Sequence, residues 1–248
     1  MSIAFVMPVY NEESTIENFI SEIMVVFCDY EKLIYIVDDC STDNTRALVR
    51  ELEKNSPGEI ILIENNLNIG HGNSTIRGWH AALSSQFDTI VCFDGDGEFN
   101  LIDLKVGLRK HLAGRYEISE GLRVERFDPA YRALVTFGVK VMVILRTGHW
   151  ILDTNTPIRI YNRDALIRIS KSLEYGSNLP NIVTSILTRR GNFYFTDFRI
   201  RSQRRKESVV GSTWDAKFTR MPSKKFLKFI FSAVRELNDF LSNPRSPS

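Results

Sequence analysis

Apolar runs alternate with polar segments through the first hundred residues. Four runs, IAFVM, LIYIV, IILI and TIVCF, begin at Ile3, Leu33, Ile60 and Thr89. Uninterrupted apolar runs of this length are typical of strands that are buried on both faces. Apolar residues at helical spacing fill the segments between them, around residues 16–24, 41–52 and 72–83. Strands that alternate with helices predict right-handed βαβ units and a doubly wound, mostly parallel sheet.

The pattern is less regular after residue 100. It predicts helices at residues 101–112, 131–146, 163–173 and 181–190, and strands at residues 157–161 and 193–202. Residues 217–241 mix aromatic and aliphatic positions with Lys224, Lys225, Lys228 and Arg235, as an amphipathic basic helix does. We therefore expect a catalytic or binding domain at 1–215, an amphipathic helical segment at 216–241 and a disordered tail at 242–248.

The composition, with 43% hydrophobic and 25% charged residues in a chain of 248, allows one sizeable core. Its net charge of +2 is unevenly distributed. Residues 1–188 carry 18 Lys and Arg against 25 Asp and Glu, whereas residues 189–248 carry 14 against 5. The basic C-terminal quarter suggests an anionic partner, namely a membrane surface, a phosphorylated substrate or nucleic acid, or else a solvated basic face.

Cysteine usage and hydropathy indicate the compartment. Cys28, Cys40 and Cys92 have no CxxC spacing, so neither a disulfide framework nor a zinc site is supported, and a reducing compartment fits. The N-terminus has no basic segment typical of a signal peptide. The longest apolar stretch, residues 133–145, is broken by Lys140 and is shorter than the roughly 20 residues that span a bilayer. We expect a soluble or peripheral protein.

Polar and acidic residues follow each of the four predicted strands. Doubly wound sheets bind ligands at these carboxyl ends of their strands. The fourth run ends in FDGDGEF, with Asp94, Asp96 and Glu98 at every second position. Acids this close repel one another unless a positive charge lies between them, and their oxygens suit Mg²⁺ or Mn²⁺. The alternative is that Asp and Gly serve only as turn formers. The GxG at Gly70 and Gly72 follows the wrong strand for a dinucleotide fingerprint, and no GxxxxGK[ST] loop is present.

Four ordered motifs carry a specific resemblance. MPVYNEE, VDDCSTDNT, NLNIGHGNSTIRG and FDGDGEF, which begin at Met7, Val37, Asn66 and Phe93, resemble those of family 2 glycosyltransferases. These are inverting enzymes with a GT-A fold. GLRVERFDPAYR and LDTNTPIRIYNRDAL resemble the branch that includes dolichol-phosphate mannose synthase and bacterial polyprenyl-phosphate glycosyltransferases. The resemblance implies an α/β GT-A domain, and the pattern of residues 217–241 itself adds a basic amphipathic helical appendage after it.

The resemblance also implies a role for individual residues. The nucleotide would lie against Pro8, Tyr10, Glu12, Asp39 and Asp94, with Asp39 bonded to the base. A metal, Mg²⁺ or Mn²⁺, and the donor diphosphate would be held by Asp94 and Asp96, together with Glu98, where relatives often have Gln. Arg123, Arg126 and Arg132 would meet the acceptor phosphate, as bidentate guanidinium groups do. Arg205 would contact the diphosphate. The histidines, His71 among them, are scattered along the sequence, and we interpret them as structural.

The implied reaction transfers a sugar from a nucleotide sugar to a polyprenyl phosphate, with no nucleic-acid partner, at the cytoplasmic face of the inner membrane. A phosphate acceptor is already an anion, whereas a hydroxyl needs a general base. The chain lacks the acidic pair that usually opens a later helix in hydroxyl-directed relatives, although Asp153 remains a candidate catalytic base. Two alternatives stay open: transfer to a sugar hydroxyl of a lipid-linked glycan or polysaccharide, and nucleotide binding without catalysis.

Overall fold

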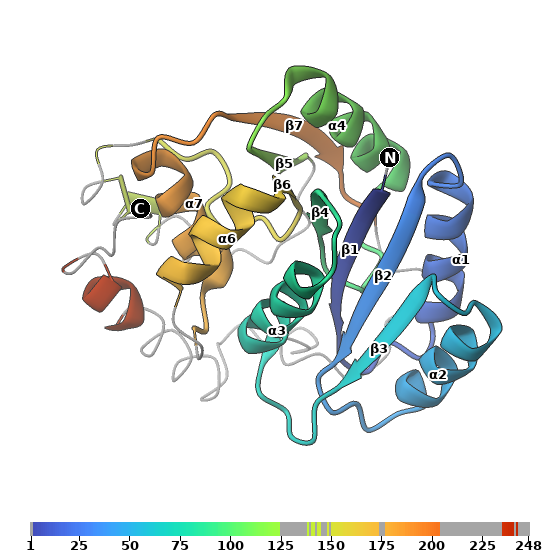
Figure 1. Cartoon of the computed structure of the whole chain (residues 1–248). Coiled ribbons are helices and arrows are strands. Elements are labelled where there is room, and N and C mark those ends of the chain that lie inside the picture. The colour runs from blue at the N-terminus through green and yellow to red at the C-terminus, as the bar shows by residue number, and fades with distance from the viewer. Residues whose placement is uncertain are drawn as a thin grey trace.

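One seven-stranded sheet organises the chain (Figure 1). The computed structural model describes residues 2–124, 138, 140–141, 143–144, 148, 150–173, 177–203, 235–240 and 242. Its strands are β1 (Ser2–Val9), β2 (Glu31–Asp38), β3 (Ile60–Glu64), β4 (Thr89–Cys92), β5 (Ile118–Val124), β6 (Arg159–Asn162) and β7 (Phe195–Arg201). Their spatial order is β3-β2-β1-β4-β6-β5-β7, and only β6 runs antiparallel to its neighbours. The predicted mostly parallel, doubly wound sheet is confirmed.

Helices cover both faces of the sheet (Figure 1). They are α1 (Ile16–Val26), α2 (Thr45–Asn55), α3 (His71–Ser84), α4 (Leu101–Gly114), α6 (Arg163–Ser172) and α7 (Pro180–Arg190). Alternate residues of β1 point to opposite faces: Phe5 packs in the cluster with α1 and α4, and Val6 packs in the cluster with α3 and α6. The uninterrupted apolar run of β1 is therefore explained by burial on both faces.

Gly78 allows α3 to approach the sheet closely. The sequence suggests that this glycine weakens the helix, yet a Cβ at this position would overlap Val6 of β1 and lie 3.1 Å from Val37 of β2. The cost in helix propensity is offset by the close packing of α3 above the central strands. This packing brings the first turn of α3, at His71, to the carboxyl ends of the strands.

Differences from the predicted elements fall in the second half of the chain. Strand β5 is not predicted, because its apolar residues are interrupted by Glu120 and Arg123. Of the predicted helix at 131–146, residues 138, 140–141 and 143–144 are helical, and the rest lies outside the described residues. The described part of the C-terminal segment, residues 235–240 and 242, is helical, and the proposed domain boundaries stay a prediction.

Candidate active site

The chain changes direction across the sheet between β1 and β4. From β1 it winds outward to β2 and β3, and then it returns to pair β4 with the other edge of β1. Such a reversal opens a crevice at the carboxyl ends of the two strands. The backbone joins the two ends there, because Gly95 N–H donates to Pro8 O over 3.2 Å. The predicted DGDGE segment and the PVYNEE segment therefore lie side by side.

The loops after β1 and β2 form one bonded unit. Asn11, in the left-handed region at φ 56°, accepts from Thr42 N at 2.8 Å, and its own N–H donates to Ser41 Oγ at 3.0 Å. Glu12 is 8% exposed, and its N–H donates to Thr45 Oγ1 at 2.8 Å. Pro8 is buried and Tyr10 is half-buried at the start of the loop. The fold thus places Pro8, Tyr10 and Glu12 beside the crevice on a braced loop.

Asp39 fixes the loop that follows β3. Asp39 is 4% exposed, and its carboxylate accepts from Asn65 Nδ2, Ile69 N and Gly70 N, each at 2.9 Å. The preceding Asp38 is fully buried and pairs with Arg46 at 2.7 Å. The two adjacent aspartates therefore have different partners. Asp39 thus holds the loop between β3 and α3 in place, and its bond to a base stays a prediction.

The DGDGE turn is so tight that both of its glycines are required. A Cβ on Gly95 would overlap Val9 and lie 2.9 Å from Met7 Cγ, and Gly97 has a φ of 68°. Asp96 Oδ1 accepts from Glu98 N at 3.0 Å, whereas the Glu98 side chain is exposed. Among the described residues, no group of three or more His, Cys, Asp and Glu side chains is arranged to hold a metal. The structure thus brings Asp94 and Asp96 to the crevice, without a closed three-acid site.

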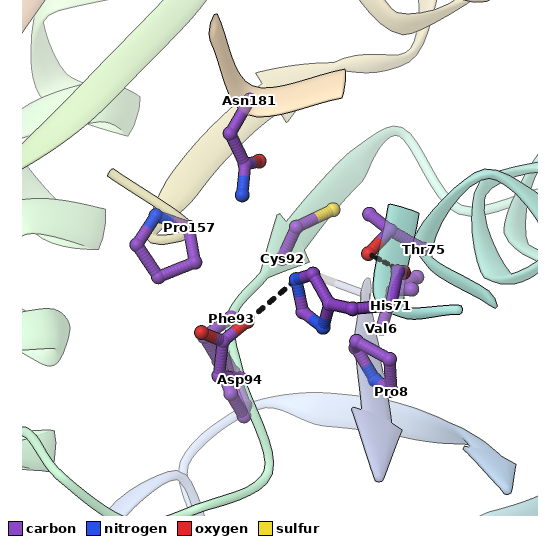
Figure 2. Close-up of a pocket in the computed structure, with 9 residues that line it drawn as sticks. All are labelled: Val6, Pro8, His71, Thr75, Cys92, Phe93, Asp94, Pro157 and Asn181. Carbon is purple, nitrogen blue, oxygen red and sulfur yellow. Dashed lines mark hydrogen bonds and ion pairs between the residues drawn. The ribbon is translucent and has the colours of Figure 1, made fainter. Parts of the chain in front are cut away.

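A pocket lies between Asp94 and the first turn of α3 (Figure 2). Its walls also include Pro8 and Phe93 from the ends of β1 and β4, and Asn181 from α7. His71 points toward Asp94, with Nε2 3.3 Å from Oδ1 (Figure 2). Asp94 Oδ1 is buried and has no hydrogen-bond partner. Among the described residues, the group that faces this oxygen is the His71 ring, and a carboxylate oxygen that accepts no hydrogen bond is available to a cation.

Arg123 and Asp153 form an ion pair. Arg123 Nε and Nη2 donate to Asp153 at 2.9 and 3.1 Å, and Nη2 also donates to Asn155 O at 3.0 Å. The Asp153 side chain is 7% exposed and that of Arg123 is 23% exposed. Two residues for which the resemblance implies separate roles are therefore partners. Arg126, Arg132 and Arg205 lie outside the described residues.

The profile named Glycosyl transferase family 2 matches residues 4–169, which is more than half of the chain. The chain belongs to this family. The enzyme is therefore a glycosyltransferase, and the predicted family is confirmed.

Curated relatives in this family include proteins named for lipid-phosphate acceptors. The UDP-N-acetylglucosamine–dolichyl-phosphate N-acetylglucosaminyltransferase of Methanococcus voltae is 27% identical over 187 residues, which is 69% of this chain and 73% of that protein. An undecaprenyl-phosphate 4-deoxy-4-formamido-L-arabinose transferase of Pectobacterium carotovorum is 26% identical over 181 residues, or 72% of this chain and 54% of that protein.

Solved structures confirm the GT-A fold. Glucosyl-3-phosphoglycerate synthase of Mycobacterium tuberculosis, with Mn²⁺, UDP-glucose and phosphoglyceric acid, matches with a TM-score of 0.67 and 15% identity, over 99% of this chain and 81% of that one. Mannosyl-3-phosphoglycerate synthase of Rubrobacter xylanophilus matches with a TM-score of 0.67 and 14% identity, over 100% of this chain and 78% of that one.

Sequence reasoning missed two residues that line the pocket of this glycosyltransferase. His71 is predicted to be structural but faces Asp94, and Asn181 lies more than a hundred residues away in the sequence. The signal for His71 was its position just after the third strand, within GHGN. No local signal marks Asn181, which is held by Arg159 of β6 through a 3.1 Å bond to its Oδ1. His111 does fit a structural role, because it is 2% exposed and bonds Ser119 Oγ at 2.8 Å.

Proposed function

We propose that this family 2 enzyme is a metal-dependent, inverting glycosyltransferase that moves a sugar from a nucleotide sugar to a polyprenyl phosphate at the cytoplasmic membrane face. The observation that carries the proposal is the Asp94 carboxylate at the crevice, whose Oδ1 accepts no hydrogen bond and faces the His71 ring at 3.3 Å. The acceptor is supported by relatives that are named for dolichyl and undecaprenyl phosphate. Among the described residues, no helix has both the length and the apolar character needed to cross a membrane.

Asp94 and Asp96 would hold Mg²⁺ or Mn²⁺ together with the donor diphosphate, and Glu98 would extend the acidic turn. The residues fit this group because the crevice offers hard oxygen ligands beside the strand ends. The metal, when bound, supplies Lewis-acid stabilisation of the negative charge that develops on the leaving diphosphate. His71 Nε2 lies 3.3 Å from Asp94 Oδ1, so its ring would border the same diphosphate site. Pro8, Tyr10, Glu12 and Asp39 would then orient the nucleotide.

Arg123 would orient the acceptor phosphate, with Asp153 as the residue that holds its guanidinium plane in place. The bidentate pair at 2.9 and 3.1 Å supports this division of roles. A phosphate oxygen is already anionic, so attack on the anomeric carbon needs no proton acceptor. A glycan hydroxyl is the second candidate acceptor, because the buried Asp153 carboxylate would then serve as the base.

The test measures nucleoside diphosphate release from a panel of nucleotide sugars, with Mg²⁺ or Mn²⁺ and with or without polyprenyl phosphate in detergent. We expect release that requires both the metal and the lipid phosphate. Asp94→Asn should lower this rate at least about 100-fold. Asp88→Asn, at the exposed opposite end of β4, is the matched control and should leave the rate unchanged. Release that requires a glycan instead of the lipid phosphate would reject the proposed acceptor.

Membrane association is tested separately. Lys224, Lys225 and Lys228 lie outside the described residues, and their charges would attract anionic lipids by about 1 kcal/mol each. Replacing all three with Gln should therefore weaken co-sedimentation with anionic vesicles by about 100-fold and reduce its salt dependence. Unchanged sedimentation would show that this basic segment has another role.

A further inference from the structure

The short segment that precedes α7 is held by a residue close to the C-terminus. Glu236 accepts from Ser177 Oγ at 2.7 Å, from Asn178 N at 3.0 Å and from Asn178 Nδ2 at 3.1 Å. These contacts join positions that are 58 and 59 residues apart. One carboxylate therefore accepts bonds from both a backbone and two side-chain groups of the segment.

The C-terminal helix is anchored next to these bonds. Leu237 is 1% exposed. It packs in a cluster with the buried residues Val143, Ile151, Leu179, Ile182 and Ile186, of which the last two lie in α7. Because the adjacent Leu237 is buried, the backbone at Glu236 is held in place, and its carboxylate stays within reach of Ser177 and Asn178. The described end of the basic segment is part of the packed body of the enzyme, in addition to any role at a membrane.

The hydrogen bonds of Glu236 also set the start of α7. Ser177 Oγ donates to Glu236 and accepts from Leu179 N at 3.2 Å. Leu179 is the N-cap residue of α7, where backbone N–H groups lack partners within the helix. The negative charge of Glu236 near this terminus is favourable for the helix dipole. Removing the charge would therefore loosen the first turn of α7, which carries Asn181.

The opposite side of the same segment packs against the pocket beside Asp94. A Cβ on Gly72 would overlap Ser177 O and lie 2.9 Å from Pro180 Cδ, so the backbone of α3 touches this segment directly. Gly72 follows His71, which faces Asp94. Asn181, one residue after Pro180, lines the same pocket (Figure 2). The segment 177–181 thus lies between Glu236 and two walls of the pocket.

We propose that Glu236 is a positioning residue of the active site, which sets His71 and Asn181 through the segment 177–181. The assignment rests on the proposed function in that the donor diphosphate lies at Asp94, beside this pocket. Glu236 does not touch the substrate. It makes the C-terminal helix a required part of the donor site, so that a change at the C-terminus alters donor affinity.

The experiment compares full-length Glu236→Gln with Asp239→Asn, which removes the same charge from an exposed position of the same helix. Hydrogen–deuterium exchange is followed at residues 177–181 and at residues 71–75. Affinity for a nucleoside diphosphate with Mn²⁺ is measured by calorimetry. We expect Glu236→Gln to speed exchange at both segments and to weaken nucleotide binding by up to about 10-fold, because an indirect positioning effect cannot exceed the free energy of the lost charge-assisted hydrogen bond. Asp239→Asn should change neither.

Faster exchange confined to residues 177–181, with residues 71–75 protected as in the unchanged protein, would overturn the proposal and leave Glu236 as a local cap. Ser177→Ala breaks the same bond from the other side and should reproduce both effects, which covers a Glu236 variant that does not fold. Absence of nucleotide binding in the unchanged protein would reject the proposed function, whereas the exchange at residues 71–75 would still decide whether Glu236 positions α3.

Discussion

Glu120 lies at the centre of a buried ionic cluster. Its carboxylate is 3.3 Å from Arg159 Nε and 2.6 Å from Arg189 Nη1, and all three side chains are nearly or fully buried. Arg159 also donates to Thr156 O, Asn181 and Ser185. One negative charge therefore offsets much of the charge of two guanidinium groups in a place that water does not reach.

Replacing Glu120 with Gln keeps the side-chain shape and removes that charge. Breaking one partner from a buried ion pair costs about 3–5 kcal/mol, because the other charge is left uncompensated. Arg159 retains its other bonds, and Asp197 lies 4.0 Å from Arg189, so we expect the lower end, about 3 kcal/mol. In a domain of this size, that loss lowers the melting temperature by roughly 6–12 °C.

Urea and thermal unfolding are measured for Glu120→Gln and for a control variant, Glu64→Gln. Glu64 pairs with Arg50 at 2.7 Å, but those side chains are 31% and 58% exposed. Glu64→Gln should cost only about 0–1 kcal/mol, because water screens the pair. Equal loss of stability in Glu120→Gln and Glu64→Gln would refute the argument that burial makes the Glu120 cluster costly to break.

Three further predictions follow from single contacts. Gly95→Ala should cost about 1–3 kcal/mol and weaken metal-dependent nucleotide binding, because its Cβ would overlap Val9, whereas Gly138→Ala, with nothing within 4 Å, should be tolerated in a stability and binding assay. Burial lowers the pKa of His111 to about 4, so the unfolded chain takes up a proton first as the pH falls below 6.5. Between pH 7 and 5 the enzyme should lose about 2 kcal/mol more than His111→Gln in urea unfolding, and parallel curves would contradict this. Asp96→Asn should abolish metal-dependent turnover while preserving the melting temperature, and full activity would remove Asp96 from the metal site.

The first half of the fold is predictable because β1, β2 and β4 are largely buried on both faces, and the edge strand β3, although Ile61 is exposed, keeps an apolar run. Each of β1 to β4 appears in the sequence as an uninterrupted apolar run, and the rule that ligands bind at strand carboxyl ends then locates the site. Strand β5 cannot be predicted in this way, because it has no uninterrupted apolar run. Its pattern contains Glu120 and Arg123, whose partners are supplied by β6, α7 and Asp153. Only tertiary contacts make such charges compatible with a strand interior.

The same distinction applies to the site residues. The spacing of Asp94 and Asp96 identifies them as candidates, because acids at alternate positions after a strand repel one another unless a cation lies between them. Asn181 has no such signal, because its place at the pocket depends on how α7 packs. The pairing of Arg123 with Asp153 likewise joins two positions 30 residues apart. Roles that arise from one loop are readable in sequence, whereas roles shared between distant segments require the structure.

Asn181 lines the pocket and also bonds Arg159 of the Glu120 cluster, which suggests that the cluster positions this pocket residue. Buried ion pairs are often no better for stability than well-packed apolar residues, so stability alone does not explain Arg159. Arg159 donates to Asn181 Oδ1 at 3.1 Å and to its backbone oxygen at 2.8 Å. It thereby orients the first turn of α7 from below, while Glu236 holds the preceding Ser177 and Asn178 from outside. Two charged groups from distant parts of the chain thus fix the same short wall of the crevice, opposite the Asp94 carboxylate.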